Sequence, residues 1–356
     1  MIWERRKKAE LSYILYEATE RCNLDCIFCY NHWKRDGYTH NPPAEDYTNS
    51  LKTLKKLFSI ASVKHVTFTG GEPMLAERIG ELILFCRMKG ASVSLITNGN
   101  HASFEELSQL INLGVQLFEL PVHAADAQTH DRMTNVQGSW EKSRATIGYL
   151  NRMGAYVVPV MVITKFNYNQ VAETLEMIHS MGLNRVMINR YNIGGKGVKT
   201  PEEVSATQNQ LNEAFAQANE KARTLKMTVS SNVCTPHCVV NPRHYPAIQF
   251  TNCSPDITHR PLTLNTSGDL RFCNHSPSVL GNIFTNKVDE IIANGQKNAC
   301  MDQRPDYCSA CNLYEKCLGG CRAASEQSGN TFSEVDPIVF LTSKKNTLKD
   351  TYHEPV

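Results

Sequence analysis

The sequence predicts an α/β fold in which a partial (β/α)6 TIM-like barrel is followed by a small cysteine-rich domain. Two observations support this prediction. Strand-like and helix-like segments alternate from residue 11 to about residue 225, which favours parallel strands joined by crossover helices. From about residue 233 to residue 329 the helical periodicity fades, and Cys, Pro, His and Asn become frequent. Such a stretch has too little apolar surface to fold by packing alone, so we expect bound metal to stabilise it.

Six segments rich in β-branched and aromatic residues predict the strands of the barrel. They span residues 12–18, 65–69, 92–97, 115–121, 156–164 and 185–189. Helices are expected between them. Val171, Leu175 and Ile178 share one helical face, for example, and Gly182 follows as a helix-ending glycine. Barrels of this kind place their active sites at the carboxyl ends of the strands, so we expect the functional residues there.

The overall composition excludes several classes of protein. Of 356 residues, 41% are hydrophobic, which excludes a disordered chain. The 37 basic and 35 acidic residues leave a net charge of +2, which argues against a surface that coats nucleic acid. The chain begins without an apolar signal sequence and has no apolar stretch that could span a bilayer. We therefore expect a cytoplasmic protein with neither a nucleic-acid partner nor a membrane partner.

Thirteen cysteines are the unusual feature of this composition. Stable disulfides are rare in a reducing compartment, so this number predicts metal or redox chemistry. Three of the cysteines lie within Cys22–Cys29 and nine within Cys234–Cys321. The remaining one, Cys86, lies in an apolar stretch and is expected to pack in the core.

The first cluster, Cys22, Cys26 and Cys29, has the spacing C-x3-C-x2-C and follows the first predicted strand. Three close thiolates suit an iron–sulfur cubane, which normally takes four ligands. Without a fourth protein ligand, one iron would stay open to a small molecule, as in catalytic zinc sites. By spacing alone, a structural zinc knuckle is an equally good interpretation.

In its context this loop resembles the signature of the radical S-adenosylmethionine (SAM) superfamily, which is C-x3-C-x-aromatic-C directly after the first strand. Phe28 fills the aromatic position. The resemblance implies that the three cysteines hold a 4Fe–4S cluster and that SAM binds its open iron. After the second strand, Gly70-Gly71-Glu72-Pro73 resembles the family's GGE segment, which binds the SAM amino group. Taken alone, this segment is an ordinary Gly-Pro turn.

The ends of the other strands supply further candidates for SAM binding. Thr97 and Asn98 end the third strand, although an Asn-Gly turn explains them equally well. Asn167 follows the fifth strand, where capping of the next helix is the favoured alternative. After the fourth strand many relatives have a Ser-Leu-Asp-Gly-like segment, whereas this chain has Pro121-Val122-His123. The SAM contact that the family makes there is therefore not transferred, and His123 is favoured as a structural histidine.

The second group of cysteines resembles the SPASM extension of radical SAM enzymes, so the resemblance covers roughly residues 11–325. Its motifs are Cys253-x14-Gly268-x4-Cys273 and Cys308-x2-Cys311-x5-Cys317-x3-Cys321. The resemblance implies two auxiliary 4Fe–4S clusters. The auxiliary cluster nearer to the SAM-binding cluster would use Cys253, Cys273 and Cys321. The farther auxiliary cluster would use Cys308, Cys311 and Cys317. A zinc ribbon is the alternative for the last four cysteines taken alone.

The family pattern ends with a further cysteine, and this chain has none beyond Cys321. Two cubanes need eight ligands, so the set is incomplete. Cys234 or Cys238 could complete the nearer cluster. The candidates for the farther one are Cys300, Asp302, Asp306 and His275. The two alternatives are an open iron that holds substrate and a single auxiliary cluster.

These motifs divide the chain into a radical SAM partial barrel (1–230), a SPASM-type domain (231–330) and a C-terminal tail (331–356), which forms either a closing helix or a loose end.

The resemblance implies that reduction splits SAM to a 5′-deoxyadenosyl radical, which takes a hydrogen atom from the substrate. The leading hypothesis is a ribosomally made peptide that acquires a side-chain crosslink. The alternatives are tetrapyrrole, heme or other cofactor biosynthesis and, in another class, a non-catalytic zinc-binding scaffold. The resemblance implies an electron donor such as a flavodoxin or ferredoxin as a partner. Because only about ten residues precede the first strand, we expect a peptide substrate to need a separate carrier protein or to bind directly in the cleft.

Overall fold

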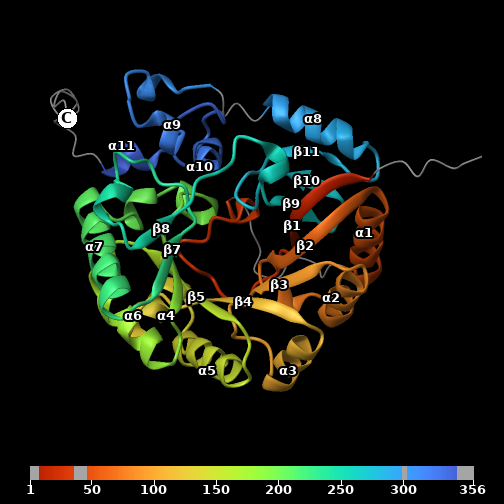
Figure 1. The fold of residues 1–356 in the computed structure, drawn as a ribbon, viewed down its shortest axis with the longest axis horizontal. Coiled ribbons are helices and arrows are strands. Elements are labelled where there is room, and N and C mark those ends of the chain that lie inside the picture. The colour runs from red at the N-terminus through yellow and green to blue at the C-terminus, as the bar shows by residue number, and fades with distance from the viewer. Residues whose placement is uncertain (1–7, 36–45, 299–302, 343–356) are drawn as a thin grey trace, which may run out of the picture.

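The computed structural model describes residues 8–35, 46–298 and 303–342. In these ranges, eleven strands form one sheet in the order β11-β10-β9-β1-β2-β3-β4-β5-β6-β7-β8. Figure 1 shows the strands curving around a ring, with α1 to α7 on its outside. The strands are β1 (Ala9–Thr19), β2 (Ala61–Gly70), β3 (Ser92–Ile96), β4 (Val115–Pro121), β5 (Val157–Ile163), β6 (Arg185–Arg190), β7 (Thr228–Ser231), β8 (Ile248–Phe250), β9 (Leu262–Asn265), β10 (Asp269–Arg271) and β11 (Val279–Asn282).

The six predicted strands are confirmed as β1 to β6, which pair in parallel in sequence order. The partial barrel that they predict is therefore confirmed. The parallel run also continues beyond it, because β7 pairs with β6 and β8 pairs with β7. These two strands are short, and β7 (Thr-Val-Ser-Ser) has little of the apolar pattern on which the prediction relied.

The helices alternate with the strands of the barrel, as the sequence predicts. Their bounds are α1 (Tyr47–Ile60), α2 (Ile79–Met88), α3 (Phe104–Asn112), α4 (Ala127–Thr134), α5 (Ser139–Arg152), α6 (Val171–Ser180), α7 (Gln208–Thr224), α8 (Val288–Asn298), α9 (Tyr314–Cys317), α10 (Arg322–Gln327) and α11 (Ile338–Thr342). Val171, Leu175 and Ile178 are fully buried on α6, and Gly182 follows with a φ of +81°. Cys86 is buried on α2, where burial raises the pKa of its thiol to about 12.

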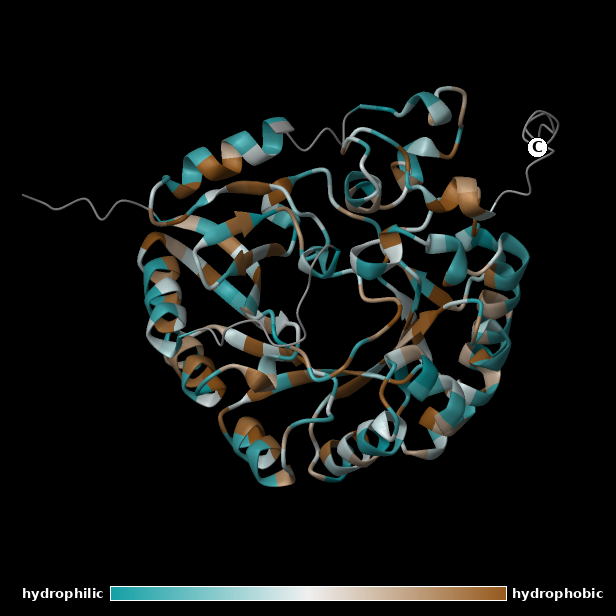
Figure 2. Ribbon diagram, turned by 180° about the vertical axis from the view of Figure 1, so that it is seen from behind, coloured by the Kyte–Doolittle hydropathy of each residue, from teal (hydrophilic) through white to brown (hydrophobic). Residues whose placement is uncertain are grey.

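The barrel strands have two different faces. Val66, Phe68 and Phe118 are fully buried in the hydrophobic core, and apolar segments of the helices and strands alternate with polar ones in Figure 2. The opposite face of β2 and β3 is polar. There His65 hydrogen-bonds to Thr67 (3.1 Å) and to Ser92 (2.6 Å). The apolar face therefore stabilises the fold, and the polar face is available for a site.

The cysteine-rich region is part of the same sheet. β9 pairs in parallel with the free edge of β1, and β10 and β11 continue that edge in antiparallel fashion. The expected domain boundary at residue 230 falls inside β7, and α11 lies within the expected tail. Among the described residues, no helix combines the length and apolar character that crossing a membrane requires.

Candidate active site

The N-terminal cysteine loop follows β1, as predicted, and is anchored to α4. The backbone N–H of Asp25 donates to the carbonyl of Thr134 (3.1 Å), and that of Ile27 donates to the carbonyl of Met133 (3.0 Å). Both acceptors lie in the last turn of α4, where carbonyls lack partners within the helix. The helix end therefore fixes the position of the loop.

The three thiols of this loop lie together beside one buried cation. Burial raises the pKa of Cys22 to about 11, and the ammonium group of Lys34 opposes this effect. Burial, and then the thiols of Cys29 and Cys22, raise the pKa of Cys26 as well. Lys34 is itself buried. Thiolates bind iron, and a nearby positive charge favours their anionic form, so this set fits a cubane with three protein ligands.

Gly70 and Gly71 bring the end of β2 against the chain that leads into the cysteine loop. The N–H of Gly71 donates to the carbonyl of Thr19 (2.8 Å), and the N–H of Glu72 donates to that of Arg21 (2.7 Å). A Cβ at Gly71 would lie 2.2 Å from the carbonyl oxygen of Arg21. Only glycine allows this approach. The two motifs found in the sequence are therefore in direct contact.

The Glu72 carboxylate links this contact to the end of β3. Its Oε1 accepts hydrogen bonds from Thr97 Oγ1 (2.6 Å) and the Met74 N–H (3.0 Å), and its Oε2 accepts one from the Asn98 N–H (2.7 Å). The Asn98 side chain in turn donates to Asn23 Oδ1 (2.7 Å), which lies in the cysteine loop. Burial raises the pKa of Glu72 to about 6. The structure thus brings together the predicted residues of the second and third strand ends.

Phe28, His123 and Asn167 form the next part of the site. The Phe28 ring meets the His123 ring edge-on, with 4.6 Å between centroids. Asn167 donates from Nδ2 to the carbonyls of His123 (2.7 Å) and Val162 (2.8 Å), and its Oδ1 accepts from the Thr164 N–H (2.7 Å). Asn167 makes no side-chain cap to the helix that follows it. It joins the ends of β4 and β5 instead. Burial lowers the pKa of His123, which agrees with a neutral structural histidine.

The sequence analysis missed a second glycine-rich segment, residues 194–197 after β6. A Cβ at Gly195, whose φ is +51°, would lie 2.3 Å from the carbonyl oxygen of Cys29. The neighbouring Lys196 forms an ion pair with Asp25 of the cysteine loop. Adjacent glycines at a strand end are the signal that identified Gly70 and Gly71, and the same signal is present here.

Four cysteines of the second group lie near one another beside β7 and β8: Cys234, Cys253, Cys273 and Cys321. The Cys234 thiol donates to Cys253 Sγ (3.1 Å), and the Cys253 N–H donates back to Cys234 Sγ (3.0 Å). Burial, the Asp336 carboxylate and then the thiols of Cys253 and Cys273 raise the pKa of Cys321 to about 12. Cys234 therefore lies with the three cysteines that are predicted to bind the nearer auxiliary cluster.

A second gathering contains the cysteines of the C-x2-C-x5-C run and one from upstream: Cys238, Cys308, Cys311 and Cys317. Burial, and then the other three thiols, raise the pKa of Cys238 to about 12. The loop that carries Cys238 packs on the turn after the run, because a Cβ at Gly320 would lie 2.6 Å from Pro236 Cγ. Cys238, unlike Cys234, thus lies with the three cysteines that are predicted to bind the farther auxiliary cluster.

The other candidates for the farther cluster are placed differently. Both ring nitrogens of His275 are engaged, with the Ile193 carbonyl (2.9 Å) and the Asn192 side chain (3.2 Å). Cys300 and Asp302 lie outside the described residues. Within the described ranges, no three His, Cys, Asp or Glu side chains converge closely enough to hold a single metal ion. The ligands of a cubane bind different irons and need not converge on one point.

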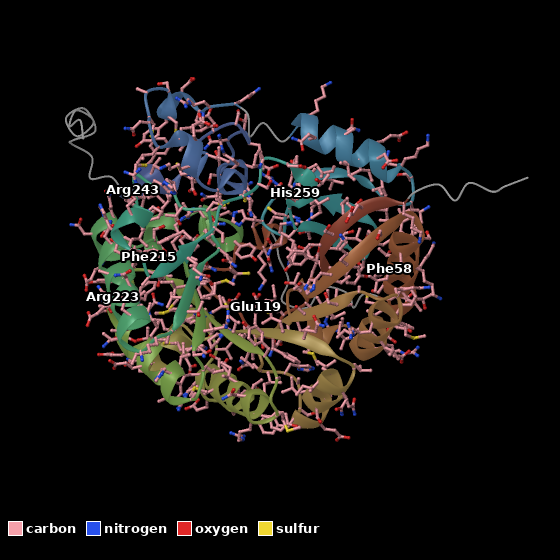
Figure 3. All side chains as sticks on the ribbon, in the orientation of Figure 1. Phe58, Glu119, Phe215, Arg223, Arg243 and His259 are labelled. Atoms are coloured by element: carbon pink, nitrogen blue, oxygen red, sulfur yellow. The ribbon has the colours of Figure 1, made fainter. Side chains whose placement is uncertain are left out.

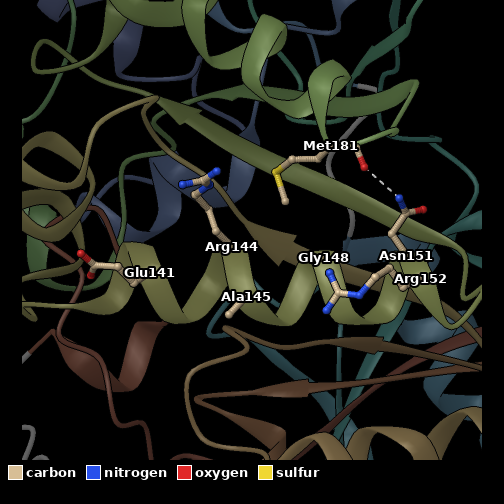
Figure 4. Close-up of a pocket in the computed structure, with 7 residues that line it drawn as sticks. All are labelled: Glu141, Arg144, Ala145, Gly148, Asn151, Arg152 and Met181. Carbon is tan, nitrogen blue, oxygen red and sulfur yellow. Dashed lines mark hydrogen bonds between the residues drawn. The ribbon is translucent and has the colours of Figure 1, made fainter.

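A surface pocket lies away from all of these residues. It has a volume of about 420 Å³ and is formed along α5, with Arg144, Arg152 and Asn151 among its lining residues. Figure 4 shows the Asn151 side chain donating to the Met181 carbonyl (2.9 Å) at one end of it. None of its lining residues belongs to the strand ends or the cysteine gatherings, so we do not assign the reaction to it.

Known proteins resemble this chain in sequence and in fold. Residues 16–178 match the family model described as the radical SAM superfamily. The chain therefore contains a radical SAM domain, and such a domain implies a 4Fe–4S cluster and SAM. The match covers the cysteine loop, Gly70–Pro73, the end of β3 and Asn167.

Two relatives match over most of their length. The chain is 25% identical over 349 residues to the AdoMet-dependent heme synthase of Nitratidesulfovibrio vulgaris, covering 94% of this chain and 93% of that protein. It is 23% identical over 332 residues to the PqqA peptide cyclase of Xanthomonas campestris pv. campestris, covering 91% and 85%.

Solved structures share the fold. SuiB of Streptococcus suis bound to its precursor peptide SuiA has a TM-score of 0.69 at 16% identity, covering 92% of this chain and 75% of SuiB. The native anSMEcpe with bound AdoMet has a TM-score of 0.71 at 15% identity, covering 92% and 94%.

Proposed function

We propose that this radical SAM enzyme oxidatively modifies a ribosomally made peptide, with a side-chain crosslink as the product. The observation that carries the proposal is the division of the cysteines. Three thiols lie at the N-terminal loop, and two further sets contain four thiols each. A set of three leaves one iron open for SAM, whereas a set of four saturates a cubane.

The N-terminal set comprises Cys22, Cys26 and Cys29. When bound there, SAM and its cluster supply hydrogen-atom abstraction from an unreactive C–H bond. The chain's own residues position the cofactor. Gly70–Pro73 would face the SAM amino group, with Thr97, Asn98 and Phe28 around it, and Asn167 would hold the ends of β4 and β5 in place. Buried Lys34 would offset the negative charge of the thiolates.

Each auxiliary set would hold one fully ligated SPASM-type cluster. Cys234, Cys253, Cys273 and Cys321 would bind the nearer cluster, and Cys238 would complete the farther one with Cys308, Cys311 and Cys317. This assignment replaces the missing downstream cysteine by one from upstream. A cubane with four thiolates has no open iron, so we infer that both auxiliary clusters carry electrons and do not bind substrate. An electron donor such as a flavodoxin or ferredoxin would supply the reducing electron, and a separate carrier protein could present the peptide.

Counting iron and sulfide in anaerobically purified protein tests the cluster assignment. Three cubanes predict about 12 irons per chain, and Cys238→Ala should lose about 4 of them together with one set of electron paramagnetic resonance signals. Cys86→Ala is the matched control, since Cys86 is buried on α2 away from the gatherings, and should keep its iron. Full iron content in Cys238→Ala would show that another group completes the farther cluster. A colourless, zinc-containing protein would support the scaffold alternative.

Mass spectrometry of short peptides encoded beside the gene tests the substrate. With the reduced enzyme and SAM, the substrate peptide should lose two hydrogens while 5′-deoxyadenosine forms. Cys26→Ala should abolish 5′-deoxyadenosine formation. The heme synthase relative supports a second candidate, oxidative modification of a tetrapyrrole side chain. Turnover of a porphyrin, with every tested peptide unchanged, would favour that candidate and overturn the peptide proposal.

A further inference from the structure

The inner face of the barrel holds a carboxyl group that the assigned cofactors do not use. Glu119 lies on β4, where its backbone pairs with Ile96 of β3 on one side and with Val158 of β5 on the other. Figure 3 shows Glu119 near the middle of the ring of strands. In the part of the chain that the structure describes, no group hydrogen-bonds or ion-pairs with its carboxyl oxygens.

Several polar side chains of the barrel strands interact with one another. Thr67 Oγ1 donates to Tyr13 Oη (3.0 Å) and also contacts His65. The buried Glu17 forms an ion pair with Arg271. Glu119 is half-buried, and a carboxyl group without a partner in such a position is costly, so its place near the end of β4 indicates a function that needs it.

The surroundings of Glu119 place it between the polar network and the cysteine loop. After the larger effect of burial, its charge contributes to the raised pKa of Tyr13, and it also acts on Tyr30, the residue that follows Cys29. Burial alone raises the pKa of Glu119 itself to about 7. A carboxyl group with a pKa near neutrality can both accept and return a proton at the working pH.

We propose that Glu119 faces the substrate and accepts the proton that leaves it during crosslinking. The inference rests on the proposed function. Joining a carbon to a second substrate atom breaks one C–H and one X–H bond and forms C–X. One hydrogen leaves as an atom to the SAM-derived nucleoside. The other leaves as a proton to Glu119 Oε, while its electron passes to an oxidised auxiliary cluster. The substrate is thus a peptide whose attacking group carries a removable proton, such as a hydroxyl, a thiol or an aromatic C–H.

The test compares Glu119→Gln with wild type on the peptide that loses two hydrogens in the screen above. We expect Glu119→Gln to form 5′-deoxyadenosine at a rate close to wild type, while crosslinked peptide falls by about 100-fold or more, because the proton acceptor is missing. Glu119→Asp should recover part of the product. Glu105→Gln, on the exposed start of α3, is the control and should behave as wild type.

The pH dependence provides a second measurement. The rate of crosslinking by wild type should rise as pH passes through about 7, where Glu119 loses its proton, and this rise should be absent in Glu119→Gln. Among the described residues, the titratable groups on which the charge of Glu119 acts are Tyr13 and Tyr30, and His65 and Thr67 belong to the same hydrogen-bonded network as Tyr13. All of them remain in the variant, so the difference between the two proteins reports Glu119.

Thermal stability separates a catalytic role from a structural one. The pKa of Glu119 is raised in the folded state, so its contribution to stability is present at low pH and is lost as pH rises through about 7. Glu119→Gln should therefore melt above wild type at about pH 8, and the difference should shrink at about pH 5. A group needed for packing would instead lower the melting temperature at both values.

Each outcome decides the inference. Equal crosslinking by wild type and Glu119→Gln, or a variant that melts lower at both pH values, overturns the role of Glu119 and leaves the proposed function intact. If wild type crosslinks no peptide and decarboxylates a porphyrin, the proposed function fails and this inference fails with it, because loss of CO₂ releases no proton to accept.

Discussion

Gly71 shows how a single residue joins the two motifs of the proposed SAM site. Its φ is not in the left-handed region, so the turn itself does not require glycine. What requires it is the 2.2 Å approach that a Cβ would make to the Arg21 carbonyl oxygen, directly before the cysteine loop. The glycine is therefore a condition for contact between two chain segments, and this contact sets where Cys22 lies relative to Glu72.

Gly71→Ala should displace the chain before Cys22. We expect the variant to lose about 4 of about 12 irons after anaerobic reconstitution, because only the N-terminal cluster depends on this contact, and to cleave SAM poorly. Iron analysis and 5′-deoxyadenosine formation measure the two effects. Gly80→Ala on α2 is the matched control, since its Cβ would meet Leu113 Cδ1 at an ordinary 3.6 Å. Full iron and normal cleavage in Gly71→Ala would contradict the argument.

At the scale of elements, α4 and α5 together support the cysteine loop. Asp131, in α4, accepts hydrogen bonds at the start of α5 from the Gly138 N–H (2.6 Å), Ser139 Oγ (2.8 Å) and the Trp140 N–H (2.9 Å). These N–H groups have no partners within the helix, so one carboxylate caps α5 from another helix. The last turn of α4 then holds the loop through its carbonyls.

Asp131→Ala should lower the free energy of unfolding by about 2 kcal/mol, because hydrogen bonds to a charged acceptor at a helix start are lost. Urea denaturation followed by circular dichroism measures this change. Asp289→Ala, on the exposed first turn of α8, removes a carboxylate without such contacts. It should stay within about 0.5 kcal/mol of wild type. A loss of equal size in both variants would show that the Asp131 contacts contribute nothing specific.

At the scale of the whole molecule, a fully buried ion pair joins the barrel to the cysteine-rich region. Arg190 at the end of β6 pairs with Asp336, and neither side chain is exposed. Arg190 also donates to the Cys234 carbonyl (2.7 Å), and Asp336 accepts from the Cys321 N–H (2.9 Å). The pair therefore contacts the backbone of two proposed ligands of the nearer cluster, which come from segments far apart in the sequence.

Asp336→Asn should destabilise the protein by about 3–5 kcal/mol, because the Arg190 charge would remain buried without its partner. Equilibrium unfolding in guanidinium chloride measures this loss under anaerobic conditions. The exposed pair of Arg304 and Glu315 offers the comparison. Glu315→Gln should change stability by less than about 1 kcal/mol, since water screens exposed charges. Similar effects of both substitutions would mean that burial of the Arg190 pair has no energetic consequence.

The sequence by itself determined the features that depend on local spacing. The strands β1 to β6 follow from runs of β-branched and aromatic residues, and the N-terminal site follows from three cysteines within one short loop and two glycines at the next strand end. Such features can be predicted from the sequence because residues that are neighbours in the chain remain neighbours in the fold. At the short strands β7 and β8 the apolar pattern is too weak to predict a strand from the sequence. Their position depends on pairing with the neighbouring strands of the sheet.

Only the tertiary structure decided which distant residues meet. Cys234 and Cys238 are four positions apart, yet one lies with Cys253 and the other with Cys308, because the chain between them turns from one gathering to the other. Glu119 is likewise one carboxylate among many in the sequence. Its lack of a partner became visible only when the strands closed around it, since burial and pairing are properties of the surrounding side chains and not of the residue itself.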